Sequence, residues 1–164
     1  MSYREVIAEE IEKLQGNISS RKKQYEMIIR RQYDKALEEA KATGHSIESI
    51  TYELLEGVER GMRVNPDAVE EALALASEVM VDLLHHSAVE DIARKQKQLM
   101  FAKAALEETV EREKSHLQDS LETFRVYAQE HGHHRFVRHM SHMEKMIGVY
   151  MGKLAGEIKY NHSS

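Results

Sequence analysis

The sequence predicts an all-α protein, an antiparallel bundle of four to five amphipathic helices that includes at least one long helix. Of its 164 residues 41% are hydrophobic and 31% are charged, and Ala, Leu, Glu, Lys and Met, which favour helices, are abundant. Apolar residues recur at intervals of three and four along most of the chain, which is helical spacing. The length suits one domain, residues 1–164, with a core of its own.

The first expected helix spans residues 2–42. Ser2 and Glu5 have the spacing of a capping box, in which the serine oxygen accepts a free backbone N–H and the glutamate reaches back to the cap. An apolar stripe with helical spacing continues across Gly16 and Asn17, where we expect either a kink or a break.

The second and third expected helices span residues 46–63 and 66–86. Gly44 suits the left-handed conformation that ends a helix, and Ser46 is a favoured N-cap for the helix that follows. Pro66, the single proline, fits the first position of the third helix because its missing N–H would have no partner there in any case.

The rest of the chain is expected to form two further helices, at residues 88–130 and 135–160. No glycine or proline occurs between Pro66 and Gly132, and one straight helix of that length would extend about 95 Å, too long for a compact domain. The stretch carries two apolar stripes that are rotated relative to each other. Together with a second capping-box pattern, they predict a turn or sharp kink at residues 85–87.

Charge and composition exclude several classes of function. A formal net charge of -5 disfavours a nucleic-acid partner, and the basic residues of the first helix, Arg21 to Lys23 and Arg30 to Arg31, are expected to form a solvated face. The absence of cysteine excludes disulfides and thiolate chemistry. We expect no transmembrane segment and a cytoplasmic location. Because no phosphate-binding loop or nucleophile pattern is found, we lean against an enzyme.

Residues 131–146, HGHHRFVRHMSHMEKM, contain five histidines and three methionines. Imidazole is a common ligand of transition metals and thioether suits Cu(I), so a site of two to four ligands is one hypothesis. The alternative is a pH-responsive polar turn and helix start, with the methionines filling the core. The candidate metal ligands are His131, His133, His134, His139 and His142.

Glu113-Lys-Ser-His116 resembles half of the metal site of ferritin-like di-iron carboxylate proteins, and this resemblance implies that Glu113 and His116 are iron ligands. That family uses a second Glu-x-x-His and two further glutamates. Here the other acid–histidine pair at this spacing, Asp82 and His85, has aspartate instead. The alternative is a helix glutamate paired with a neighbouring cation. Because Glu113 lies in an apolar stripe, its carboxylate needs a partner.

Glycines repeat every four residues at two places, Gly57 with Gly61 and Gly148 with Gly152 and Gly156. A glycine inside a helix costs about 1 kcal/mol relative to alanine, so the repeats predict a smooth face that another helix approaches closely. Chance placement near a frayed C-terminus is the alternative for the second group, and loosening of a helix that is about to end is the alternative for the first.

These observations favour a non-enzymatic helical scaffold or protein-interaction module acting as a homo-oligomer, because a helix over 88–130 would carry an apolar stripe about 65 Å long that needs cover. A metal-binding bundle, using residues 131–146 or the pair Glu113 and His116, is the alternative. A second alternative is the coat of a hydrophobic particle, since the composition is similar to that of phasins and apolipoprotein-like proteins.

Overall fold

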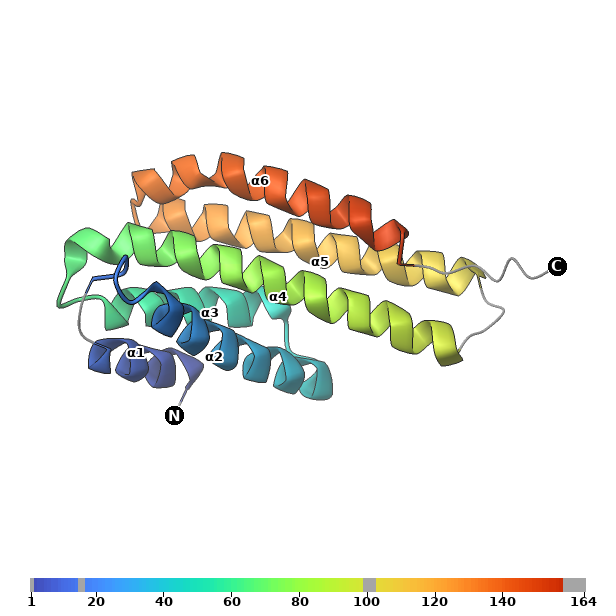
Figure 1. The fold of residues 1–164 in the computed structure, drawn as a ribbon, viewed down its shortest axis with the longest axis horizontal. Helices are drawn as coiled ribbons and strands as arrows, with labels where there is room; N and C mark the ends of the chain where they lie inside the picture. The colour runs from blue at the N-terminus through green and yellow to red at the C-terminus, as the bar shows by residue number, and fades with distance from the viewer. Residues whose placement is uncertain (1, 15–16, 99–102, 158–164) are drawn as a thin grey trace.

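The computed structural model describes residues 2–14, 17–98 and 103–157. These residues form six α-helices packed together and one 3-10 turn, with no strand among them, which confirms the all-α class but exceeds the expected four to five helices (Figure 1). The elements are α1 (Tyr3–Lys13), α2 (Lys22–Thr43), α3 (Ile47–Gly61), η1 (Pro66–Ala68), α4 (Val69–Gln98), α5 (Lys103–Glu130) and α6 (His134–Ala155).

The helix expected over residues 2–42 is two helices. Of the two alternatives that the sequence allowed, a kink or a break in the helix, the break is correct. α1 ends at Lys13 and α2 begins at Lys22. Between them the side chain of Asn17 accepts a hydrogen bond from the backbone N–H of Ser20 at 2.8 Å, a local bond that competes with helix formation. Of the two hydrogen bonds of the expected capping box, the one that Ser2 Oγ accepts from the backbone N–H of Glu5 is present.

The expected turn at 85–87 is wrong, because α4 runs unbroken from Val69 to Gln98. α4 packs against α2, α3, α5 and α6, so it buries apolar side chains on several sides. The two rotated stripes are therefore two faces of one buried helix rather than two helices. The expected helix 88–130 is divided between the end of α4 and α5, which begins at Lys103.

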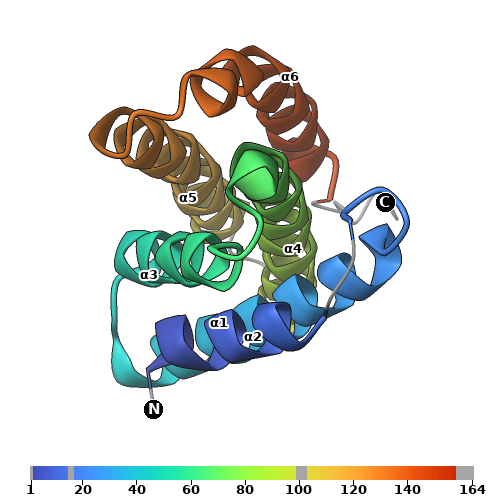
Figure 2. The same ribbon diagram turned by 90° about the vertical axis from the view of Figure 1, so that its left-hand side faces the viewer.

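Figure 2 shows α4 in the middle of the bundle, with the other helices around it. In Figure 1, α4, α5 and α6 lie side by side, and the chain reverses direction from each to the next. The apolar stripe of α5 is covered within the chain, as Leu106, Val110, Leu117 and Phe124 are all buried. The uncovered stripe that suggested self-association is therefore not a feature of the fold.

One helix segment, Pro66–Gln98, is long and apolar enough to cross a membrane by length and composition, with a mean hydropathy of 1.2 over its best window. Because 61% of that window is buried inside the bundle, the segment has the character of a core helix.

Gly57 and Gly61 bring α3 into close contact with α1. A Cβ added at Gly57 would lie 2.3 Å from Ile7 Cγ2 and 2.7 Å from the carbonyl oxygen of Arg4, and one added at Gly61 would lie 2.7 Å from Ile11 Cβ. The two backbones approach so closely that no side chain fits between them.

The second glycine group is placed differently. A Cβ at Gly148 or Gly152 would meet nothing within 4 Å, and one at Gly156 would meet only the Lys153 carbonyl oxygen at 3.4 Å. Within the described part of the chain, α6 therefore makes no close helix contact through these glycines.

We predict opposite effects for alanine in the two groups. Gly57→Ala should lower the free energy of unfolding by about 1–3 kcal/mol, because the new methyl group forces α1 away from α3. Gly152→Ala should raise it by about 0.5–1 kcal/mol, because alanine lowers the entropy of the unfolded chain and clashes with nothing. Denaturant unfolding of both variants measures this. Equal effects of the two substitutions would contradict the close α1–α3 contact.

Candidate functional site

α3 and α5 present the same pattern of side chains to a shared groove. Each contributes four residues at spacings of three and four, which places them on one face of the helix, and α3 adds a fifth residue, Glu48. The groove has a volume of about 620 Å³ and is lined by Ser49, Tyr52, Glu53 and Glu56 of α3, by Asp119, Glu122, Thr123 and Val126 of α5, and by Arg4 and Glu48. We call it the acidic groove.

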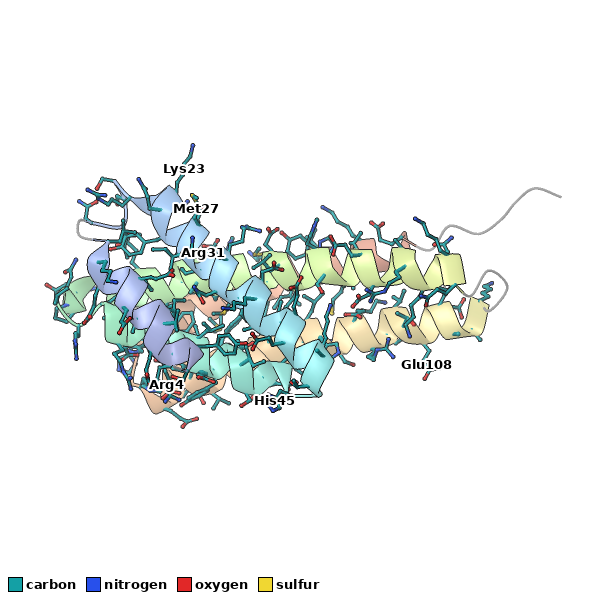
Figure 3. The ribbon with its side chains drawn as sticks, turned by 90° about the horizontal axis from the view of Figure 1, so that it is seen from below. Arg4, Lys23, Met27, Arg31, His45 and Glu108 are labelled. Carbon is teal, nitrogen blue, oxygen red and sulfur yellow. The ribbon has the colours of Figure 1, made fainter. Side chains whose placement is uncertain are left out.

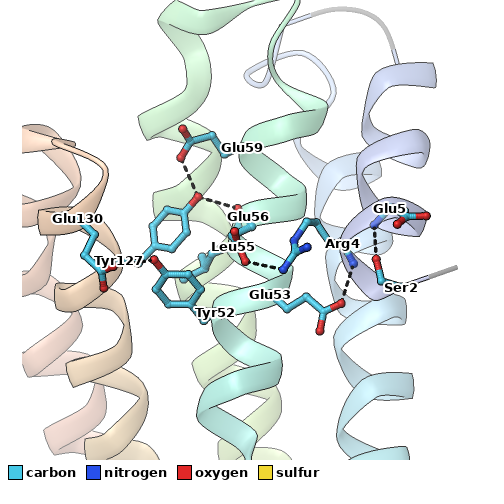
Figure 4. Close-up of polar contacts among 10 residues, drawn as sticks. All are labelled: Ser2, Arg4, Glu5, Tyr52, Glu53, Leu55, Glu56, Glu59, Tyr127 and Glu130. Atoms are coloured by element: carbon cyan, nitrogen blue, oxygen red, sulfur yellow. Dashed lines mark hydrogen bonds and ion pairs between the residues drawn. The ribbon is translucent and has the colours of Figure 1, made fainter.

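The acidic groove holds five carboxylates and one guanidinium group. That guanidinium belongs to Arg4 of α1, whose Nη2 lies 2.8 Å from Glu56 Oε1 (Figure 4). The backbone N–H of Arg4 also donates to Glu53 Oε1 at 3.4 Å. Since Arg4 is the one cation among the described lining residues, the groove is strongly negative.

Two of the carboxylates, Glu48 and Asp119, share a hydrogen bond across the groove. Burial and the neighbouring Glu48 raise the pKa of Asp119. The pKa of Glu48 is lowered, chiefly because the Ser46 hydroxyl donates to its carboxylate at 2.7 Å. Two carboxylates this close favour holding a proton between them, and an entering cation can take the place of that proton.

Apolar surface lies beside the carboxylates. The ring of Tyr52 packs edge-on against Tyr127, with centroids 5.0 Å apart, and its hydroxyl donates to Glu130 at 3.3 Å. Val126 is 37% exposed, one of few large apolar side chains open to solvent among the described residues. The groove can thus contact both the charged end and the aliphatic stem of a cationic side chain.

A partly buried network fixes the helices that carry the groove. The Tyr127 hydroxyl donates to Glu59 Oε1 at 2.7 Å, and its oxygen also lies 3.3 Å from the Leu55 carbonyl oxygen (Figure 4). His133 Nε2 also lies 2.7 Å from Glu59 Oε1. Burial raises the pKa of Tyr127 above its usual value, so the phenol remains a donor. One carboxylate therefore links α3, α5 and the residue that precedes α6.

The histidines before the body of α6 are used in these contacts rather than gathered round a common point. The His131 ring stacks on Tyr127 with centroids 4.0 Å apart, and its Nδ1 lies 2.9 Å from the Tyr127 carbonyl. His133 contacts Glu59, and His134 is the exposed first residue of α6.

His139 and His142 do share a face of α6, with ring centroids 5.2 Å apart, and His142 Nε2 lies 3.1 Å from Glu78 of α4. The pKa of His139 is lowered, mainly by burial and partly by His142, whereas Glu78 acts in the opposite direction.

Glu113 has the partner that its apolar position required, but this partner is another carboxylate. It is buried and shares a hydrogen bond with Asp91 of α4, and Lys41 Nζ of α2 lies 3.1 Å from Asp91 Oδ2. The charge of His116, by contrast, favours the ionised forms of Glu48 and Asp119. The two residues of the di-iron-like motif therefore line one pocket with Asp91 and Glu48, but Glu113 pairs with Asp91 whereas His116 affects Glu48 and Asp119.

The other acid–histidine pair is also used elsewhere. Asp82 lies 3.0 Å from Arg30 Nη2 and accepts from the Tyr150 hydroxyl at 2.9 Å, while His85 stacks on the Tyr150 ring. Across residues 2–14, 17–98 and 103–157, no group of three or more histidines or carboxylates is arranged to hold a metal ion. A transition metal stays a prediction, which elemental analysis of the purified protein tests.

Comparisons with protein families, with curated proteins and with solved structures find no match for this chain. Its function is therefore argued from its own geometry.

Sequence reasoning missed the acidic groove. The signal is present, since residues 49, 52, 53 and 56 have the same spacing as residues 119, 122, 123 and 126 and each set includes acids. Neither set is informative alone, because a run of acids on a helix is usually a solvated face. Only the packing of α3 against α5 combines them into a site.

We predict that Glu113 makes stability depend on pH. Burial, with the nearby charge of Asp91, raises the pKa of Glu113 from 4.5 to about 7. The folded protein therefore holds a proton that the unfolded chain releases, and stability falls as pH rises through this window. Glu113→Gln should raise the free energy of unfolding at pH 8 by about 1–3 kcal/mol and change it little at pH 5.

Urea unfolding at both pH values measures this difference. Glu108→Gln, at an exposed position on α5, is the matched control, and its effect on the free energy of unfolding should be the same at both pH values. A Glu113→Gln effect of the same size at pH 5 and pH 8 would show that the folded-state pKa of Glu113 is ordinary.

Proposed function

We propose that this protein is a non-enzymatic helical interaction module whose acidic groove binds a basic helical segment of a protein partner. The observation that carries the proposal is the composition of the groove, in which five carboxylates and a single arginine surround the apolar side chains of Tyr52 and Val126.

A basic segment satisfies both parts of this surface. Lysine and arginine ends would meet the carboxylates, and their aliphatic stems, or a neighbouring apolar residue, would cover Tyr52 and Val126. The ring of Tyr52 adds a face suited to cations. The negative electrostatic potential of the groove also raises the rate of association with a positively charged partner.

The lining residues argue for binding rather than covalent catalysis. Ser49 and Thr123 are the aliphatic hydroxyls of the groove, and no histidine is among its described lining residues. The Thr123 hydroxyl donates to the backbone carbonyl of Asp119 at 2.9 Å, and neither hydroxyl is hydrogen-bonded to a described side chain that could act as its base.

The particle-coat alternative has less support. The large apolar side chains exposed among the described residues lie on separate parts of the bundle, Met27 on α2, Val64 before η1, Val126 on α5, and Val137 and Val149 on α6. A coat would therefore require the bundle to open.

We predict that the protein binds a helical peptide of about 15 residues that carries lysines and arginines around one methionine. Neutralising two groove carboxylates, Glu53→Gln with Glu122→Gln, should weaken binding about 2- to 30-fold, because each charge contact contributes about 0.2–1 kcal/mol. Fluorescence anisotropy of a labelled peptide measures the affinity. Raising the salt from about 0.05 to 0.5 M should weaken binding as well.

Glu71→Gln with Glu108→Gln is the matched control, since it makes the same change in net charge at exposed positions of α4 and α5 outside the groove. Its affinity should equal that of the wild-type protein. Equal weakening by both double variants would mean that only the overall charge attracts the peptide, and the groove would lose its assigned role.

A further inference from the structure

A surface of the opposite sign lies on α2. Lys23, Met27 and Arg31 are four residues apart and form one line along the helix. Met27 is 64% exposed, and Figure 3 shows Lys23 pointing away from the bundle. Arg31 also contacts Glu10 at 2.6 Å. We call these three residues the basic patch.

The start of α2 lacks the negative charge that a helix N-terminus favours. Its N-cap, Arg21, makes no side-chain cap hydrogen bond, and no acidic residue lies in the first turn. Lys22 meets Glu26 at 4.0 Å, but Lys23 has no ion pair with any described carboxylate. Cations at this end oppose the helix dipole, so carboxylates supplied from outside would stabilise it.

Resting on the proposed function of the groove, we infer that its partner is a second copy of this chain, whose basic patch occupies the acidic groove. Met27 of one copy would pack on Tyr52 and Val126 of the other, and the groove carboxylates would lie against the cationic start of α2. The lengths agree, since the patch extends about 12 Å along α2 and the groove residues of α5 extend about 10 Å.

The patch and the groove are different surfaces on different sides of the molecule. In Figure 3 Lys23 and Met27 lie at one edge of the view, and Arg4, which lines the groove, lies near the opposite edge. A contact between unlike surfaces leaves a free patch and a free groove on every pair, so copies add in a chain or close into a ring. The assembly is therefore expected to grow with concentration.

Two complementary variants test this arrangement by sedimentation velocity at low salt. The patch variant is Lys23→Glu with Met27→Glu, and the groove variant is Glu53→Lys with Glu122→Lys. Each alone should stay at the chain mass of 19.0 kDa. Their equimolar mixture should form a species of at least twice that mass, because the groove of the patch variant and the patch of the groove variant are both intact. The wild-type protein should pass this mass as its concentration rises.

Matched variants separate the contact from general effects of charge and folding. Glu71→Lys with Glu108→Lys reverses the same number of charges outside the groove and should assemble like the wild-type protein. Met27→Ala keeps every charge, and it should weaken association about threefold to tenfold if Met27 packs in the groove. Circular dichroism melting of each variant reports whether it is folded.

Three results would overturn the inference: a wild-type protein that remains monomeric, a patch variant that assembles like wild type, or folded variants whose mixture forms no pair. The peptide measurement separates this outcome from failure of the proposed function. If the basic peptide binds the groove while the wild-type chain stays monomeric, the groove serves another protein and the second copy is excluded.

Discussion

The rest of the structure depends on the need of α4 to bury apolar side chains around most of its circumference. The helices α2, α3, α5 and α6 supply that cover, each in direct contact with it. α1 joins the bundle by a different route, through the close approach that Gly57 and Gly61 permit on α3. The acidic groove follows from this arrangement, because α3 and α5 meet each other while both pack on the central helix.

Carboxylates of α4 contact polar groups of α6. Glu70 accepts from the backbone N–H groups of Arg135 at 2.8 Å and Phe136 at 3.2 Å, so it satisfies donors at the start of α6. Farther along, Glu78 contacts His142 and Asp82 contacts Tyr150. A carboxylate at successive positions along one helix thus fixes the register of α6 against α4, which apolar packing alone leaves loosely specified.

Local patterns predicted what local physics decides. The helical class, the N-caps at Ser2 and Ser46 and the left-handed Gly44 follow from short-range bonds and backbone preferences, and all three are present. The continuity of α4 could not be predicted, because a helix buried on several sides carries apolar residues that look like two separate helices. The partners of Glu113 and the existence of the acidic groove could not be predicted from the sequence either. Both depend on which helices become neighbours, and no spacing within one helix encodes that choice.

The way α6 is attached implies that its stability is graded along its length. Glu70 and the pair Glu59 and His133 hold its beginning, whereas its later turns contain Gly148 and Gly152 over open space. Glycine favours the unfolded chain, so partial opening would start at the far end and proceed toward the anchored end. Amide protons of α6 would then exchange with solvent in that order, and each opening would briefly uncover the side of α4 and α5 that α6 protects.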